Sequence, residues 1–183
     1  PTGSLAAACG LLRDLDALDE AGRITDVGRR MARLGTHPRL ARMMLAGSDA
    51  GEKALAAELA ALLEERDPLR GREAPADIGL RLDLLAGGDH AAADRATVQR
   101  IRRAASLHRR RLGLGNGVVA EGDAGALLAA GFPDRIAARR GAMDGAFRLA
   151  SGQGARITGM DPLAKAPLLA VADLEIMGTE ARI

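Results

Sequence analysis

The spacing of apolar residues predicts helices along the first two thirds of the chain. In residues 4–18 apolar side chains recur at every third or fourth position, from Leu5 to Leu18, which is typical of one face of an amphipathic helix. Thr25 is placed to cap a short second helix, and Pro38 suits the first turn of a third. The same spacing predicts longer helices over residues 52–66, 75–86 and about 94–112.

The pattern changes after a glycine-rich run at residues 113–117, which stops the last long helix and is the best candidate for a domain boundary. The run is not a phosphate loop, because no strand precedes it and no Gly-Lys-Ser/Thr follows. After a short helix over 124–130, segments divided by Gly, Asp and Pro predict the strands of a small barrel: 136–140, 146–150, 155–158 and 168–174. The expected fold class is mainly α with a small β part.

The composition limits what this fold can be made of. With 183 residues, 48% of them hydrophobic, the chain can bury one sizeable core or two small ones. Phe132 and Phe147 are its only Phe, Trp or Tyr residues, so the core has to be aliphatic. No apolar run approaches the roughly 20 residues that span a bilayer, and the first residues lack a signal pattern, so we expect a cytoplasmic protein without membrane contact. The single Cys9 is expected to be a buried, inert thiol.

The net charge is only +2, but the basic residues are concentrated in one segment. Residues 51–90 carry five basic and nine acidic residues, whereas residues 91–115 carry seven basic and one acidic. In a helix over 95–111, Arg95, Arg102 and Arg109 repeat every seven residues and share one face, with Arg103 and Arg110 beside it. Phosphates could bind this stripe. The alternative is a solvated arginine face, or ion pairs with the acidic segment.

The motifs of common catalytic sites are missing. No Gly-x-x-x-x-Gly-Lys-Ser/Thr loop, Asp-Glu-x-His signature or Gly-x-Ser-x-Gly elbow occurs in the sequence. His37, His90 and His108 lack the close spacing of metal ligands. We therefore expect no catalytic residue, no metal and no cofactor in this chain, and no enzymatic activity of its own.

Several ordered motifs resemble a known family. Residues 11–32, a leucine-rich helix with Ala-Leu-Asp, a glycine and Thr-x-x-Gly-Arg, resemble the start of the helicase-associated region of DEAH helicases. His37-Pro38-Arg39-Leu40 is similar to the bacterial HrpB branch of that family rather than to its eukaryotic members. Further segments keep the HrpB order: 62–69, 125–137, 147–155 and 161–164. The resemblance covers essentially the whole chain.

The resemblance implies three structural units and a function. Residues 1–38 would end a winged-helix module, 39–115 would form a helical bundle called the ratchet domain, and 120–183 an OB-like barrel. The family chain continues past the barrel, so closure by a last strand is not assured. ATP and Mg²⁺ would bind upstream, on RecA-like motor domains.

Two functions follow as hypotheses. In the first, the chain is the accessory nucleic-acid-binding region of an ATP-dependent helicase and holds a single strand against its own upstream RecA-like motor. The strand is expected to be RNA, although the sequence alone does not distinguish RNA from DNA. With so few aromatic residues, the contact would be mainly with the backbone and poorly sequence-specific. In the alternative, the chain is a protein-interaction scaffold that docks on the motor or regulates it without touching nucleic acid.

Overall fold

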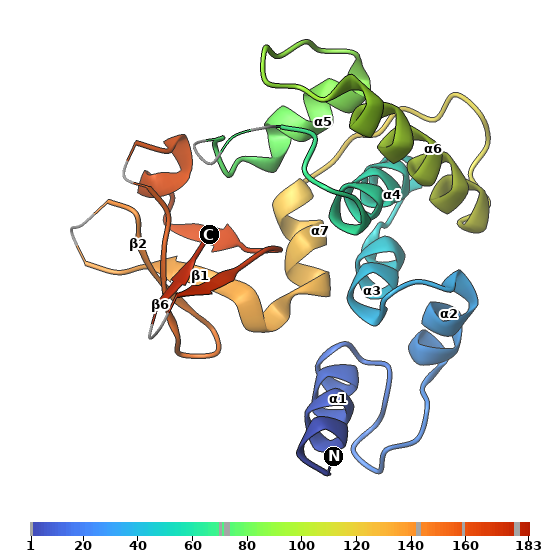
Figure 1. The fold of residues 1–183 in the computed structure, drawn as a ribbon. Coiled ribbons are helices and arrows are strands. Elements are labelled where there is room, and N and C mark those ends of the chain that lie inside the picture. Colours follow the sequence, from blue (N-terminus) through green and yellow to red (C-terminus); the bar gives the residue numbers. More distant parts are fainter. Residues whose placement is uncertain (1, 70, 72–73, 142–143, 159, 178–179) are drawn as a thin grey trace.

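The computed structural model of the chain describes residues 2–69, 71, 74–141, 144–158, 160–177 and 180–183. Within them a helical part and a smaller β part lie side by side (Figure 1). The helices have these bounds: α1 Thr2–Asp14, α2 Asp26–Leu34, α3 Pro38–Ala46, α4 Ala50–Glu64, α5 Ile78–Ala86, α6 Arg95–Arg111 and α7 Ala124–Gly131. The fold class is mainly α with a small β part, as the sequence predicts.

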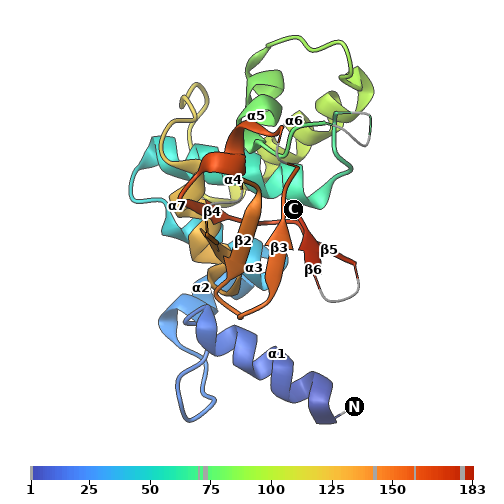
Figure 2. The ribbon, with the colours of Figure 1, turned by 90° about the vertical axis from the view of Figure 1, so that its left-hand side faces the viewer.

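Local capping sets where several helices begin. The Thr25 side chain accepts a hydrogen bond from the Gly28 backbone N–H, and Pro38 occupies the first turn of α3, as predicted. The predicted helix over residues 4–18 is too long, because α1 ends at Asp14 and the chain then turns through Asp16, whose φ is +57°. The first half of α1 projects from the rest of the molecule (Figure 2), and the predicted apolar face there is largely exposed, with Cys9 only half-buried.

One hydrophobic core joins α2, α3, α4 and α7. Met31, Met43 and Leu59 are buried in it, together with Leu127, Leu128 and Phe132 from α7 and the residue after it. Gly131 permits the close approach of α7 to α3, since a Cβ there would lie 2.7 Å from the Arg39 carbonyl oxygen. Helix α7 follows the predicted boundary at 113–117 in sequence, yet it packs within the helical part. The three-unit division itself remains a prediction.

The β part is a sheet that curls into a small barrel of the OB-like kind expected. Its strands have these bounds: β1 Ile136–Arg139, β2 Ala146–Leu149, β3 Gly154–Arg156, β4 Leu168–Ala170, β5 Glu175–Met177 and β6 Glu180–Arg182. Their order is β4-β1-β2-β3-β6-β5, with β3 and β6 parallel and the other neighbours antiparallel. Only residues 171–174 separate β4 from β5, so the two ends of the sheet come together. Phe147 fills the interior, where it is 1% exposed.

The predicted strand over 168–174 is too long, because β4 ends at Ala170 and residues 171–174 belong to no strand. Its first part, β4, pairs with β1, whereas β5 begins at Glu175 and pairs with β6. Strands β5 and β6 were not predicted, because each is only three residues long and begins with Glu, so neither forms an apolar run.

Two polar contacts fix the barrel to the helical part. Arg39 of α3 donates to both carboxylate oxygens of Asp134, at 2.5 and 2.9 Å, and to the Gly131 carbonyl oxygen at 3.1 Å. Buried Asp161 accepts a hydrogen bond of 2.7 Å from the Ala76 backbone N–H, which lies just before α5. None of the described helices is long and apolar enough to cross a membrane.

Candidate nucleic-acid interface

The buried side of α6 decides which of its arginines reach solvent. Ile101, Ala105 and His108 face α4 and are almost completely buried. The His108 ring Nε2 lies 2.8 Å from a Glu64 carboxylate oxygen, and the Thr36 hydroxyl donates to the other oxygen of that carboxylate. Successive residues of a helix are rotated by about 100° about its axis. The residue directly after a buried one therefore lies on the side of the helix, and the second residue after it points nearly opposite to the buried one.

Arg102 and Arg109 occupy the side positions and bond within the protein. Arg102 donates from Nε to the Leu85 carbonyl oxygen (3.1 Å) and from Nη2 to that of Leu84 (3.0 Å), at the carboxy-terminal end of α5. Arg109 donates from Nη1 to the Val118 carbonyl oxygen at 2.7 Å and from Nη2 to Glu58 Oε1 at 2.6 Å. Both side chains therefore help to hold neighbouring segments against α6.

Arg103 and Arg110 point away from the protein. Both are exposed, and Arg111 is exposed beside them at the end of the helix. Among the described residues none of these three side chains has a hydrogen-bond or ion-pair partner. Arg95 is exposed as well and lies 3.7 Å from Asp89 in a pair whose side chains are both more than four-fifths exposed. This outer side of α6 is called the arginine face below, and it consists of Arg103, Arg110 and Arg111.

A hollow of about 400 Å³ adjoins the arginine face. It lies between α6 and the glycine-rich turn that follows it, and its polar lining comes from Arg102, Arg109, Arg110, Ser106, Asn116 and the Glu58 carboxylate that pairs with Arg109. Arginine has five N–H donors, and those of Arg102 and Arg109 are only partly used by the bonds above. The hollow can therefore offer guanidinium and amide donors to an anion such as a phosphate.

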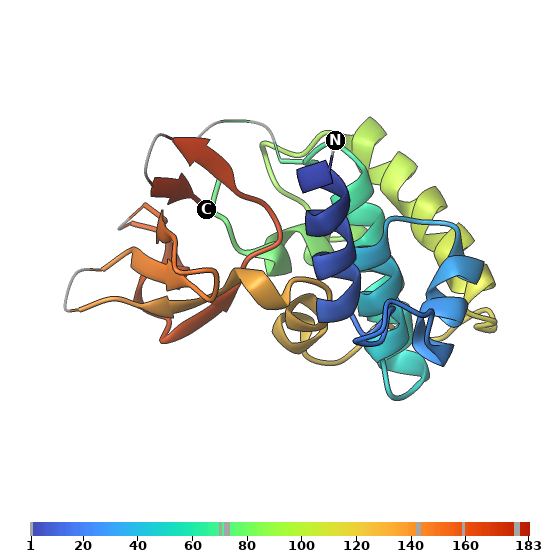
Figure 3. The same cartoon turned by 90° about the horizontal axis from the view of Figure 1, so that it is seen from below.

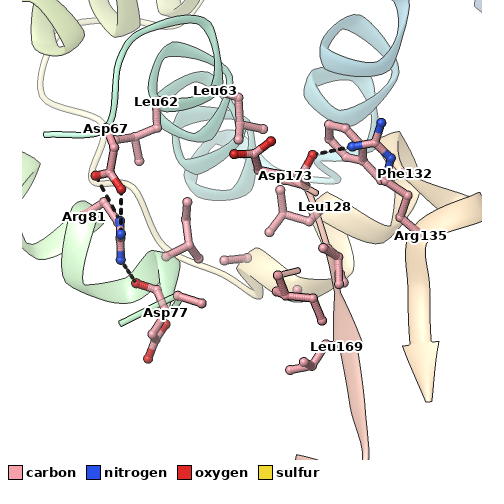
Figure 4. Close-up of a pocket in the computed structure, with 18 of the residues that line it drawn as sticks. Leu62, Leu63, Asp67, Asp77, Arg81, Leu128, Phe132, Arg135, Leu169 and Asp173 are labelled. Carbon is pink, nitrogen blue, oxygen red and sulfur yellow. Dashed lines mark hydrogen bonds and ion pairs between the residues drawn. The ribbon is translucent and has the colours of Figure 1, made fainter. Parts of the chain in front are cut away.

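A larger cleft of about 1530 Å³ lies between the helical part and the barrel (Figure 4). Leucines from α4, α7 and β4 line its middle, and charged side chains stand at its edges. Arg81 closes one end, with Nη2 donating to Asp67 at 2.7 Å, and Arg135 donates to the Ala172 carbonyl oxygen at 2.7 Å at the other. The barrel and α6 lie on opposite sides of α4 and α7 (Figures 1 and 3), so the cleft and the arginine face are separate surfaces.

Known proteins that are similar to this chain indicate its family. Residues 10–36 match the winged-helix helicase associated domain, HA2. Over 186 aligned positions the chain is 36% identical to the ATP-dependent RNA helicase HrpB of Escherichia coli strain K12, with 100% of this chain and 21% of that protein covered. Two crystal structures of E. coli HrpB, described as a DExH-box NTPase and as a DEAH/RHA helicase, match with TM-scores of 0.78 and 0.77 at 34% identity. The matches cover 100% and 96% of this chain and 21% and 20% of theirs. Over its whole length the chain corresponds to a fragment of a DEAH helicase of the HrpB type.

The HrpB-type assignment confirms the family indicated by the motifs of residues 11–32 and 62–69, and makes the chain a helicase accessory region. The chain spans about a fifth of the length of the HrpB proteins it matches (21% and 20%). The winged-helix match at 10–36 falls inside the predicted segment 1–38.

The five arginines predicted as binding residues in this HrpB-type region separate into distinct groups. The hollow brings together Arg102, Arg109 and Arg110, whereas Arg103 and Arg95 lie outside its lining. Arg111 and the turn that completes the hollow were not among the predicted binding residues. The signal for Arg111 was present, since it directly continues the pair Arg109-Arg110. Their role in nucleic-acid binding stays a prediction.

Proposed function

We propose that this region binds a single RNA strand on the arginine face of α6, and that it holds the strand while an ATP-driven motor elsewhere in the parent protein moves it. The observation that carries the proposal is the group of exposed guanidinium groups without a protein partner among the described residues, beside a hollow lined by further arginines. Exposed arginines of this kind neutralise phosphates and release counterions. RNA is the expected nucleic acid because the E. coli relative is named an RNA helicase.

The contact would be made with the RNA backbone rather than with the bases. Phe132 and Phe147 are both buried, at 6% and 1% exposure, so neither can stack on a base. Arginine bonds to phosphate oxygens carry no sequence information. We therefore propose poorly sequence-specific binding that weakens with salt, and we place ATP and Mg²⁺ on the motor domains of the parent protein.

A second function, docking on the motor without contact to nucleic acid, has support from other residues of α6. Arg109 pairs with Glu58, and Arg100 lies 3.5 Å from Glu65, so part of the basic excess is neutralised within the protein. If the whole basic segment served only to hold α4 and α5, no RNA affinity would depend on the arginine face.

The test replaces Arg103, Arg110 and Arg111 together with Gln and measures the binding of labelled single-stranded RNA by fluorescence anisotropy at several salt concentrations. The matched control replaces the exposed Arg13, Arg30 and Arg33 of α1 and α2 with Gln. Both variants lose the same net charge. A single strand loses roughly 0.7 of logarithmic salt slope per phosphate contact, so loss of three contacts flattens the slope by about 2.

We expect the arginine-face variant to bind every RNA sequence more weakly and with this flatter slope, and the control to keep the slope of the natural chain. Equal losses of RNA affinity in the two variants would mean that net charge, rather than the arginine face, determines binding. RNA affinity that is absent from the natural chain, or unchanged in the arginine-face variant, would contradict the proposal and favour docking on the motor.

A further inference from the structure

We propose that the cleft between the helical part and the barrel binds a basic, amphipathic helix of a protein partner. The inference does not depend on RNA binding at the arginine face, since it concerns a separate surface on the other side of α4 (Figure 3). It rests on the size of the cleft, its apolar lining and the sign of its unpaired charges.

The size and lining of the cleft suit a peptide better than a small molecule. Its volume of about 1530 Å³ exceeds the range of about 300–1,000 Å³ that is usual for small-ligand pockets. Leu62 and Leu63 of α4, Leu128 of α7 and Leu169 of β4 line it, as Figure 4 shows. Leu168 also lines it and is 62% exposed. An amphipathic helix could bury its apolar face on this surface.

Three of the four arginines in the described lining are engaged by bonds within the protein. Arg39 bonds to Asp134, Arg81 to Asp67 and Arg135 to the Ala172 carbonyl oxygen. Their guanidinium groups are therefore partly neutralised or hydrogen-bonded within the protein itself. A phosphate would have to displace or share these contacts.

Several carboxylates in the lining, by contrast, have no cationic partner among the described residues. They are Asp77, Asp123, Asp173 and Glu175. Asp77 and Asp123 each accept a backbone N–H at the start of a helix, and Asp173 and Glu175 are exposed on the barrel side. Arg182 also lines the barrel side, opposite Glu175 in the β5–β6 pair. The described lining still holds seven carboxylates against four arginines, so the cleft presents an excess of negative charge to a ligand. Such a cleft repels nucleic acid and attracts Lys and Arg side chains.

The probe for the experiment is a labelled peptide of roughly 18 residues, about five helical turns, with Leu on one face and Arg on the rest. The matched probe carries Glu in place of every Arg. Because the chain has a net charge of +2, general electrostatic attraction does not favour the Arg peptide, and its binding reports a local acidic surface.

The variants remove charge or apolar surface from the cleft without touching its buried residues. Asp173→Asn with Glu175→Gln neutralises the barrel-side wall, and Asn still offers the oxygen that caps the Leu174 N–H. Leu168→Asn removes an exposed apolar side chain. The control, Glu20→Gln with Asp144→Asn, removes the same charge from exposed positions outside the cleft lining.

We expect the Arg peptide to bind and the Glu peptide not to bind. The Asp173/Glu175 variant should weaken the Arg peptide about fivefold, as the loss of two exposed ion pairs would. Leu168→Asn should also weaken it, the control should not, and the Arg103/Arg110/Arg111 variant should bind the peptide as the natural chain does.

Several results would overturn the inference. They are the absence of Arg-peptide binding, equal binding of the Glu peptide, and an equal loss in the control variant. RNA affinity that rises several-fold in the Asp173/Glu175 variant would assign the cleft to nucleic acid instead. Self-association of the natural chain in sedimentation that Leu168→Asn abolishes would assign the cleft to a second copy.

Discussion

Arg109 and Arg110 are neighbours on α6, yet replacing each with Gln is expected to affect different properties. Arg109→Gln removes two hydrogen bonds, one of 2.7 Å to the Val118 carbonyl oxygen and one of 2.6 Å to Glu58. It also leaves the Glu58 carboxylate, whose side chain is 20% exposed, without its cation. Arg110→Gln removes no side-chain hydrogen bond or ion pair within the described residues.

The size of the stability effect follows from these contacts. A hydrogen bond to a charged group contributes about 1.5–3 kcal/mol when buried, and the partial exposure of this pair reduces the figure. We expect Arg109→Gln to lower the free energy of unfolding by about 2 kcal/mol. For a chain of this length that corresponds to a fall in Tm of about 4–8 °C. Arg110→Gln should stay within about 0.5 kcal/mol.

The assay is urea unfolding followed by far-ultraviolet circular dichroism, since the chain has no Trp or Tyr for fluorescence. A double-mutant cycle with Glu58→Gln isolates the ion pair, for which we expect a coupling of about 1 kcal/mol. RNA affinity is measured on the same variants. Arg110→Gln should weaken RNA binding, whereas Arg109→Gln should affect mainly stability.

Two results would refute this assignment of roles. One is equal stability of the Arg109→Gln and Arg110→Gln variants. The other is a loss of RNA affinity in Arg109→Gln, without a loss of stability, that matches the loss in Arg110→Gln. Either would mean that the inward contacts of Arg109 do not hold α6 in place.

Three further changes test the fold. Partial burial raises the pKa of the Asp134 carboxyl, but the hydrogen bonds and charge of Arg39 outweigh this effect and hold the pKa below its ordinary value. The stability that Asp134 contributes is therefore present above the unfolded pKa of about 3.9 and is lost as the pH falls through the folded pKa. The difference in urea midpoint between the natural chain and Asp134→Asn should accordingly shrink below about pH 4. Gly131→Ala should lower Tm, because a Cβ 2.7 Å from the Arg39 carbonyl oxygen outweighs a gain in helix propensity of about 1 kcal/mol. Phe147→Ala should cost about 3–5 kcal/mol and speed hydrogen exchange in the barrel strands; protection equal to that of the natural chain would contradict its place in the barrel core.

The orientation of α6 shows why the candidate site was only partly predictable. In α6 the apolar Leu107 is 42% exposed, whereas the adjacent polar residue His108 is buried. Burial of His108 is made possible by Glu64, a partner 44 residues earlier in the chain. Helical spacing shows that Arg102 and Arg109 share a face. It does not show that this face points at α5 and Glu58.

The sequence by itself determined the helices, the family and the concentration of basic charge, because helix caps and apolar spacing depend on residues a few positions apart. Thr25, which caps α2 through Gly28, is such a case. Only the tertiary structure decided which arginines are exposed, where α7 packs and that an acidic cleft lies beside the barrel. These features depend on pairs far apart in the chain, such as Arg109 with Glu58 and Arg39 with Asp134, separated by 51 and 95 residues. Such pairs form only when distant segments pack together, so they cannot be predicted from the pattern of neighbouring residues.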